Sequence, residues 1–216
     1  TANPVQSPRR VNAPDIAARL NSLVPGGLLD SSRTDARTSA SFAGIGATGW
    51  YPPDPSMAVG PNHVLECVNS SVAWYSRTST GTAQYQQTAA TFFSGVAQTT
   101  FIFDPKCFYD RSNQRFVVLF VEKQDSTAIS NALLAVSDDA DPNGTWYRYR
   151  LSAKLTNSST GASYWLDYPG FGYTNGAYVV SGNMFGFVSG FAGAQFIVIP
   201  TAPVLTGQPA SATSFL

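Results

Sequence analysis

Three aspartates stand out because each begins a similar stretch of sequence. Asp54, Asp104 and Asp167 each precede a short apolar segment, a polar turn and a longer apolar segment. If the short segments form neighbouring strands, the three carboxylates meet at one end of them, where ligand sites of β-proteins commonly form. Paired carboxylates can serve as the acid and base of glycoside hydrolysis. An aspartate that recurs in every unit can also cap a turn by accepting backbone N–H bonds, and we favour this structural role.

Aromatic residues flank these aspartates. Trp50 and Tyr51 lie shortly before Asp54, and Trp165, Tyr168 and Phe171 surround Asp167. Aromatic faces beside carboxylates suit stacking against sugar rings, so Trp50, Tyr51, Trp165 and Tyr168 are predicted ligand-binding residues. The alternative is packing between neighbouring sheets, which uses the same side chains.

One loop could hold a calcium ion. Asp138, Asp139, Asp141 and Asn143 place four oxygen-bearing side chains within six residues, and hard cations prefer oxygen ligands. The spacing differs from that of an EF-hand, which requires a glutamate at its twelfth position. Turns rich in Asp and Asn also form without metal. The sequence therefore predicts either no cofactor or Ca²⁺ at this loop.

The two cysteines are predicted to form a disulfide. Cys67 falls on the second strand of the first unit and Cys107 on the first strand of the second, which neighbouring sheets would place side by side. Two buried free thiols are the alternative. Other nucleophilic chemistry is poorly supported, because His63 is the only histidine and no G-x-S-x-G motif occurs.

Composition narrows the class of protein. Of the 216 residues 44% are hydrophobic and 12% are charged, and the net charge is zero. The hydrophobic content argues against disorder, and the neutral charge argues against a nucleic-acid partner. The longest apolar run, residues 116–121, is too short for a transmembrane segment. Low charge with abundant Gly and Tyr predicts an extracellular or cell-surface protein, and the start at Thr1 suggests a processed mature form.

Residues 1–48 differ in pattern from residues 49–216. Ile16, Leu20, Leu23 and Val24 have helical spacing, and Pro25-Gly26-Gly27 would end such a helix. We therefore expect an N-terminal strap with one short helix over 1–48. From residue 49 onward the pattern is of strands and turns, with the clearest strands over 72–75, 116–121, 132–136, 146–151 and 195–199.

The repeated unit predicts the fold. Three segments align, over 54–68, 104–120 and 167–182. Repeats of roughly 40 to 50 residues with four antiparallel strands are typical of β-propeller blades. We expect an all-β chain of about two and a half to three blades, with a two-sheet sandwich as the alternative. Closed propellers typically have about four to eight blades. The missing blades would come from the remainder of the same polypeptide or from another chain, and Phe215 would begin a fresh strand.

Several motifs resemble a family of large secreted bacterial proteins with a predicted β-propeller fold. The resemblance rests on residues 52–64 (PPDPSMAVGPNHV), 110–116 (DRSNQRF), 135–149 (AVSDDADPNGTWYRY) and 167–169 (DYP). It implies this fold and export from the cell, and it implies little about activity. Separately, residues 103–106 (FDPK) resemble the aspartate-containing strand of five-bladed glycoside hydrolases of the arabinanase and invertase kind. No glutamate in the third unit matches their general acid.

These observations lead to one favoured function and two alternatives. We expect an extracellular β-propeller module for binding or surface attachment, with a glycan or other polysaccharide as its ligand. The first alternative is a glycoside hydrolase that uses Asp54, Asp104 and Asp167. The second is a purely structural repeat of a larger surface assembly.

Overall fold

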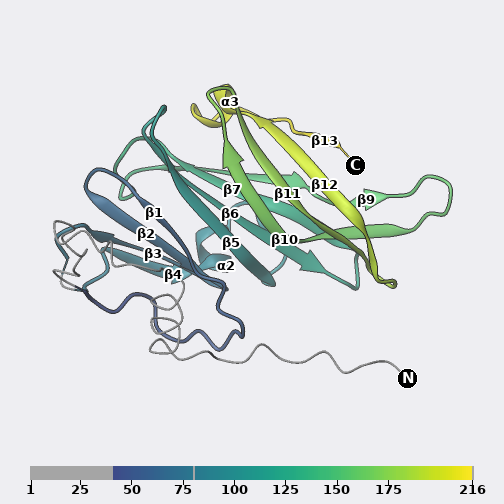
Figure 1. The fold of residues 1–216 in the computed structure, drawn as a ribbon, viewed down its shortest axis with the longest axis horizontal. Coiled ribbons are helices and arrows are strands. Elements are labelled where there is room, and N and C mark those ends of the chain that lie inside the picture. Colours follow the sequence, from purple (N-terminus) through teal and green to yellow (C-terminus); the bar gives the residue numbers. More distant parts are fainter. Residues whose placement is uncertain (1–40, 80, 216) are drawn as a thin grey trace, which may run out of the picture. The chain divides into compact units, whose positions relative to one another are not determined.

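The computed structural model describes residues 41–79 and 81–215, and their fold is all-β. The strands form three antiparallel sheets with the orders β1-β2-β3-β4, β5-β6-β7-β8 and β13-β12-β11-β10-β9 (Figure 1). The short helix expected near residues 16–24 lies outside the described residues. Residues 41–53 form no strand and run along the first sheet, where Ile45 N donates to Glu66 Oε2 at 2.8 Å.

The first sheet is small and mostly buried on one face. Its strands are β1 (Ser56–Val59), β2 (His63–Val68), β3 (Ser71–Ser76) and β4 (Tyr85–Thr88). Alternate side chains, including Leu65, Cys67, Val72 and Trp74, point into the core shared with the second sheet. Met57 and Val59 on the opposite face are 63% and 46% exposed.

The second sheet lies between the other two, which explains its apolar sequence. Its strands are β5 (Ile102–Asp110), β6 (Arg115–Gln124), β7 (Ile129–Ser137) and β8 (Trp146–Ser152). In β6 the even-numbered residues Phe116, Val118 and Phe120 join the core with the first sheet. The odd-numbered residues Val117 and Leu119 join the core with the third sheet. The prediction of a strand buried on both faces over 116–121 is confirmed.

The third sheet contains the strands β9 (Leu155–Thr156), β10 (Ser163–Tyr173), β11 (Ala177–Gly186), β12 (Phe191–Pro200) and β13 (Thr213–Phe215). Leu166, Tyr178 and Ile197 face the second sheet. Phe215 pairs with Phe196 of β12, so β13 completes the third sheet. The strand expected at Phe215 is therefore present, although it ends at this residue and pairs with β12 of the same sheet.

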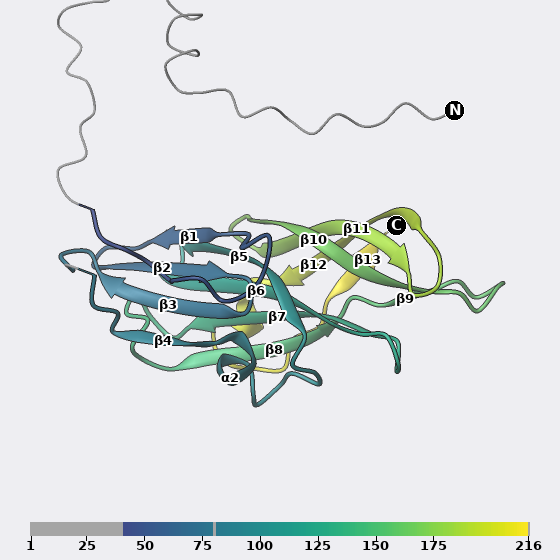
Figure 2. The ribbon, with the colours of Figure 1, turned by 90° about the horizontal axis from the view of Figure 1, so that it is seen from below.

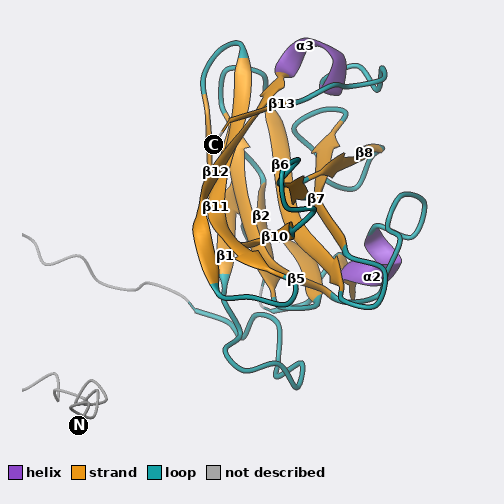
Figure 3. Cartoon of the chain, turned by 90° about the vertical axis from the view of Figure 1, so that its right-hand side faces the viewer, coloured by secondary structure: helices purple, strands orange, loops and turns teal. Residues whose placement is uncertain are grey.

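Strands β1, β5 and β10, one from each sheet, lie side by side. Strand β5 contacts both β1 and β10, and Figure 2 shows β1, β5 and β10 on one side and β4 and β8 on the other. The helices α2 (Ala89–Phe92) and α3 (Thr201–Val204) have four residues each and lie on the side of β8 (Figure 3). Among the described residues, no helix is long and apolar enough to cross a membrane.

Candidate functional site

The same backbone conformation recurs just before β1 and within β5 and β10. Asp54, Asp104 and Tyr168 have φ angles of 44°, 50° and 44°, and each precedes a proline. Positive φ is uncommon for residues other than glycine. In β5 and β10 this dipeptide interrupts the strand pairing as a bulge. Tyr168, and not Asp167, therefore occupies in the third unit the place of Asp54 and Asp104, which corrects the alignment made from sequence.

A series of hydrogen bonds connects these three positions. Asn69 Nδ2 donates to Asp54 Oδ2 at 2.7 Å, and Asn69 Oδ1 accepts from Asp104 N at 2.6 Å. Asp104 Oδ2 in turn accepts from Tyr168 N at 2.9 Å. Asn69 of the first sheet thus fixes the backbone of Asp104 in the second sheet, and Asp104 fixes the backbone of Tyr168 in the third. The sequence analysis missed Asn69, although an Asn that directly follows a strand is a common turn residue.

Asp54 lies just before β1, and Asp104 and Asp167 lie in the N-terminal halves of β5 and β10; we call this region the aspartate end. Burial raises the pKa of Asp104 to about 6, the N–H of Tyr168 opposes this, and the charges of Asp167 and Asp54 raise it further. Burial also raises the pKa of Asp167, which Lys123 opposes and Asp54 reinforces. Within 41–79 and 81–215, no three Asp, Glu, His or Cys side chains are grouped closely enough to hold a metal ion.

Two lysines accompany the carboxylates. Lys106 Nζ lies 4.5 Å from the centroid of the Tyr168 ring. Lys123 Nζ lies 3.8 Å from the centroid of the Trp165 ring and 2.9 Å from Asp125 Oδ1. These cations cover one face of each ring, so the aspartate end carries both signs of charge beside aromatic surface.

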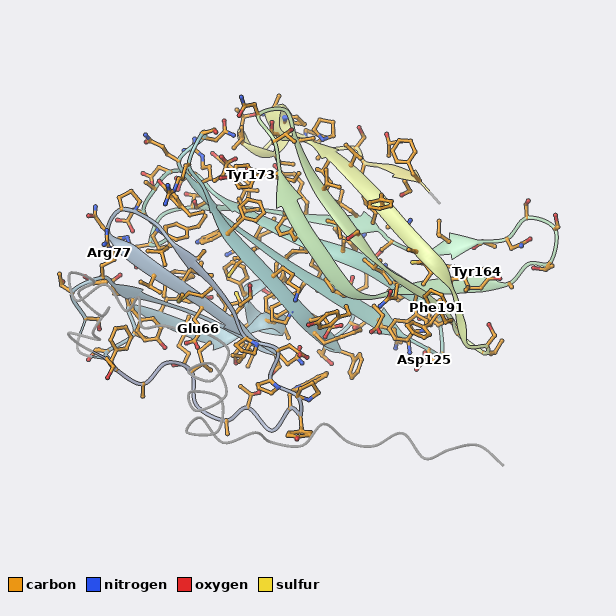
Figure 4. The ribbon with its side chains drawn as sticks, in the orientation of Figure 1. Glu66, Arg77, Asp125, Tyr164, Tyr173 and Phe191 are labelled. Atoms are coloured by element: carbon orange, nitrogen blue, oxygen red, sulfur yellow. The ribbon has the colours of Figure 1, made fainter. Side chains whose placement is uncertain are left out.

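Aromatic side chains form a continuous row beside the aspartates. Trp50 stacks on Phe103 with the ring centroids 6.4 Å apart, and Phe103 contacts Trp165 at 6.3 Å. Trp165 contacts Phe185 at 5.6 Å, and Phe185 contacts Phe191 at 5.7 Å. Figure 4 shows Phe191 and Asp125 together at this end of the third sheet.

The predicted ligand residues divide into exposed and half-buried ones. Tyr51 and Tyr168 are 97% and 56% exposed, whereas Trp50 and Trp165 are half-buried within the row. A pocket of about 370 Å³ opens beside Trp50 and Tyr51. The sequence analysis missed Phe101 and Phe191, which are 49% and 64% exposed. Phe171 is not part of the row, because it packs against Phe108 and Tyr178.

Most of the side chains predicted to bind calcium accept hydrogen bonds from backbone N–H groups of their own loop. Asp138 Oδ1 accepts from Thr145 N at 3.0 Å, Asp139 Oδ1 from Asp141 N at 2.6 Å, and Asp141 Oδ1 from Asn143 N at 3.0 Å. Asn143 Oδ1 accepts from the indole of Trp74 at 2.9 Å, and His63 Nε2 lies 3.6 Å from Asp141 Oδ1. These contacts fasten the loop to the first sheet. No cluster of metal-ligating side chains occurs at this loop among the described residues. Calcium binding here therefore stays a prediction.

Cys67 and Cys107 are free thiols that lie next to each other. Cys67 is fully buried, and Cys107 donates its backbone N–H to Ser56 Oγ at 2.9 Å. Burial raises the pKa of the Cys67 thiol, and a hydrogen bond with Cys107 raises it further. The predicted adjacency is therefore present, while the disulfide itself stays a prediction.

No protein-family model, curated protein sequence or solved structure matches this chain. The arguments about its function accordingly rest on the residues and contacts above.

Proposed function

We propose that this chain is an extracellular β-propeller module that binds a glycan at the aspartate end. Three features support the description of the sheets as blades: their antiparallel order, the adjacency of β1, β5 and β10, and the X-Pro dipeptide with positive φ that recurs at these three strands. The low charge of the sequence favours the extracellular setting.

Further blades would cover the two outer sheet faces. Phe196 and Phe215 lie opposite each other across β12 and β13, and they are 51% and 54% exposed. Met57 and Val59 occupy the outer face of the first sheet. Both faces of the second sheet are buried by a neighbouring sheet, and a closed propeller would bury the outer faces in the same way. The additional blades would come from the rest of the polypeptide or from a partner chain.

One observation supports the glycan as ligand: exposed aromatic rings lie beside carboxylates at the same end of the sheets. Tyr51, Phe101, Tyr168 and Phe191 offer ring faces to the apolar faces of sugars. Asp54 and Asp167 offer acceptors for sugar hydroxyls, and charge-assisted hydrogen bonds of this kind are stronger than neutral ones. Attachment to a surface polysaccharide would follow from such binding.

The test is binding of the full chain to a panel of immobilised polysaccharides. We expect retention on at least one polysaccharide, and we expect Tyr51→Ala and Phe101→Ala to weaken it because each removes an exposed ring. Phe196→Ala is the matched control, since Phe196 is 51% exposed and Phe101 is 49% exposed. Retention by none of the polysaccharides, or equal loss with the control variant, would leave the structural-repeat alternative as the better account.

A glycoside hydrolase is the second candidate, because the raised pKa of Asp104 resembles the tuned carboxylate of an acid catalyst. Against it, the Asp104 side chain is only 8% exposed, and its carboxylate accepts the N–H of Tyr168. We therefore favour binding over catalysis. Release of reducing sugar that Asp104→Asn abolishes, with the fold intact, would reverse this preference.

A further inference from the structure

A groove between the first two sheets opens at the opposite end of β1 and β5 from the aspartates. Its volume is about 470 Å³, within the range of small-molecule sites. The turn that follows β1 and the turn that follows β5 form its walls, and Figure 1 shows both turns on the same side of the sheets. The residues lining the groove are Val59, Gly60, Pro61, Arg77, Tyr109, Arg111 and Gln114.

The two arginines belong to turns that hydrogen bonds hold in place. Arg77 Nη1 donates to Pro61 O at 2.9 Å, which ties this side chain to the wall of the groove. Arg111 directly follows Asp110, whose Oδ1 accepts from Ser112 N at 3.0 Å and from Asn113 N at 3.1 Å. Figure 4 shows Arg77 at the edge of the first sheet. The backbone that carries both guanidinium groups is therefore ordered before any ligand arrives.

Neither arginine has a carboxylate partner in the part of the chain that the structure describes. The ion pairs there are His63–Asp141 and Lys123–Asp125. Asp110 is fully buried, and its Oδ2 accepts from Asn113 Nδ2 and Tyr178 Oη. Both guanidinium groups thus keep donors for an external acceptor.

A buried hydroxyl in the same groove also lacks a partner. The Oη atom of Tyr109 is shielded from solvent and has no hydrogen-bond partner among the described residues, which is a costly state for a polar group. The charged groups that act on this hydroxyl are Arg115, Asp110 and Asp139. Gly60 lets the turn pack closely over this region, because a Cβ there would lie 2.5 Å from the Phe116 ring.

We propose that the Arg77–Arg111 groove binds a small organic molecule through an oxyanion group: a carboxylate, a sulfate or a phosphate. The planar guanidinium fork matches the geometry of such groups, and Arg77 and Arg111 both line the groove. The hydroxyl of Tyr109 is shielded in the free protein, so it can serve as a neutral donor only if ligand binding uncovers it. Val59 and Pro61 supply apolar surface for the remainder of the ligand, as the ring of a sugar acid or sulfated sugar requires. This site is separate from the aspartate end and does not depend on glycan binding there.

The test is calorimetric titration of the full chain at constant ionic strength with glucuronate, glucose 6-sulfate, glucose 6-phosphate and uncharged glucose. We expect at least one charged sugar to bind and glucose not to bind, and the three charged probes identify the preferred oxyanion. Arg77→Gln and Arg111→Gln should each weaken binding about tenfold or more, because each removes charge-assisted hydrogen bonds. Failure of all three charged sugars to bind at tens of millimolar would overturn the proposal.

Two further variants separate this site from general attraction to positive charge. Arg150→Gln is the matched control, because Arg150 is exposed and its Nη1 also donates to a backbone carbonyl, that of Val96 at 2.8 Å. It should leave binding unchanged, and an equal loss of affinity would overturn the proposal. Tyr109→Phe should weaken binding with no loss of thermal stability, since it removes a hydroxyl that has no partner in the free protein. Unchanged affinity in this variant would exclude the hydroxyl from the site.

Discussion

The side-chain oxygen of Asn69 accepts the backbone N–H of Asp104 at 2.6 Å, although the two residues are 35 positions apart in the chain. Asn69 lies in the turn between β2 and β3 of the first sheet, and Asp104 lies near the start of β5 in the second sheet. The same side chain also donates to the carboxylate of Asp54. One buried amide therefore joins two of the three strained residues at the aspartate end.

Asn69→Ala should lower the free energy of unfolding by about 1 to 3 kcal/mol, because it leaves a buried N–H without an acceptor and a carboxylate without its donor. Urea denaturation measures this change. Asn175→Ala is the control, since its side chain also makes an inter-sheet bond, to Ser112, but at an exposed position. This variant should stay within about 0.5 kcal/mol of the unmodified protein. Equal small effects at both positions would contradict the structural role of Asn69.

The pKa of Asp104 predicts how stability depends on pH. The folded-state pKa of about 6 lies above the ordinary pKa of an aspartate, about 3.8, so the folded protein holds this proton more tightly than the unfolded chain does. The protonated Asp104 side chain therefore adds to the free energy of unfolding below about pH 4, and this stabilisation is lost as the pH rises through about 6. Asp104→Asn imitates the protonated form and keeps an acceptor for Tyr168 N.

The unmodified protein and Asp104→Asn should therefore be similar in stability near pH 4. Near pH 7 the variant should be more stable by on the order of 2 kcal/mol, from the linkage between pKa and stability. Chemical denaturation at a series of pH values provides the measurement. If the free energies of unfolding of the two proteins changed with pH in the same way across this range, Asp104 would not be buried as described.

Mild oxidation should join Cys67 to Cys107. With diamide as oxidant, the two thiols lose two electrons and two protons to form one S–S bond, and the diamide is reduced to its hydrazine. The bond would close a loop of about 40 residues and should stabilise the fold by about 3 to 4 kcal/mol in the chain-entropy model. Mass spectrometry after alkylation of the unfolded, unreduced protein detects it. Cys107→Ser is the control, and full alkylation of both cysteines after oxidation would refute the prediction.

Asn143→Ala should destabilise the protein by about 1 to 3 kcal/mol, because the buried indole N–H of Trp74 loses its acceptor. Asn157→Ala is a suitable comparison, since Asn157 Oδ1 caps an exposed turn within the third sheet's outer hairpin.

Thermal unfolding with added calcium or with a chelator tests the metal prediction for the loop that contains Asp138, Asp139, Asp141 and Asn143. A rise in melting temperature with calcium would establish the site, and an unchanged melting temperature would contradict it.

Local sequence pattern determined most of the strands. The apolar run over 116–121 predicts a central strand, because only a strand covered on both faces tolerates apolar residues at every position. The polar edge strand β4 went unpredicted, since its sequence, YQQT, carries no hydrophobic alternation and its pairing with β3 defines it. The repeated context brought Asp54 and Asp104 together as equivalent residues, and both precede a proline with positive φ.

Tertiary structure decided the roles of the residues at the aspartate end. Sequence similarity placed Asp167 in register with Asp54 and Asp104, but the backbone places Tyr168 there, because positive φ precedes the proline in each unit. The function of Asn69 depends on Asp104, 35 positions away along the chain, and the raised pKa of Asp104 is caused first by its burial between packed sheets. Hydrophobic periodicity is a local property and specifies strands, whereas hydrogen bonds between sheets arise only when the sheets have packed, so no single stretch of sequence encodes them.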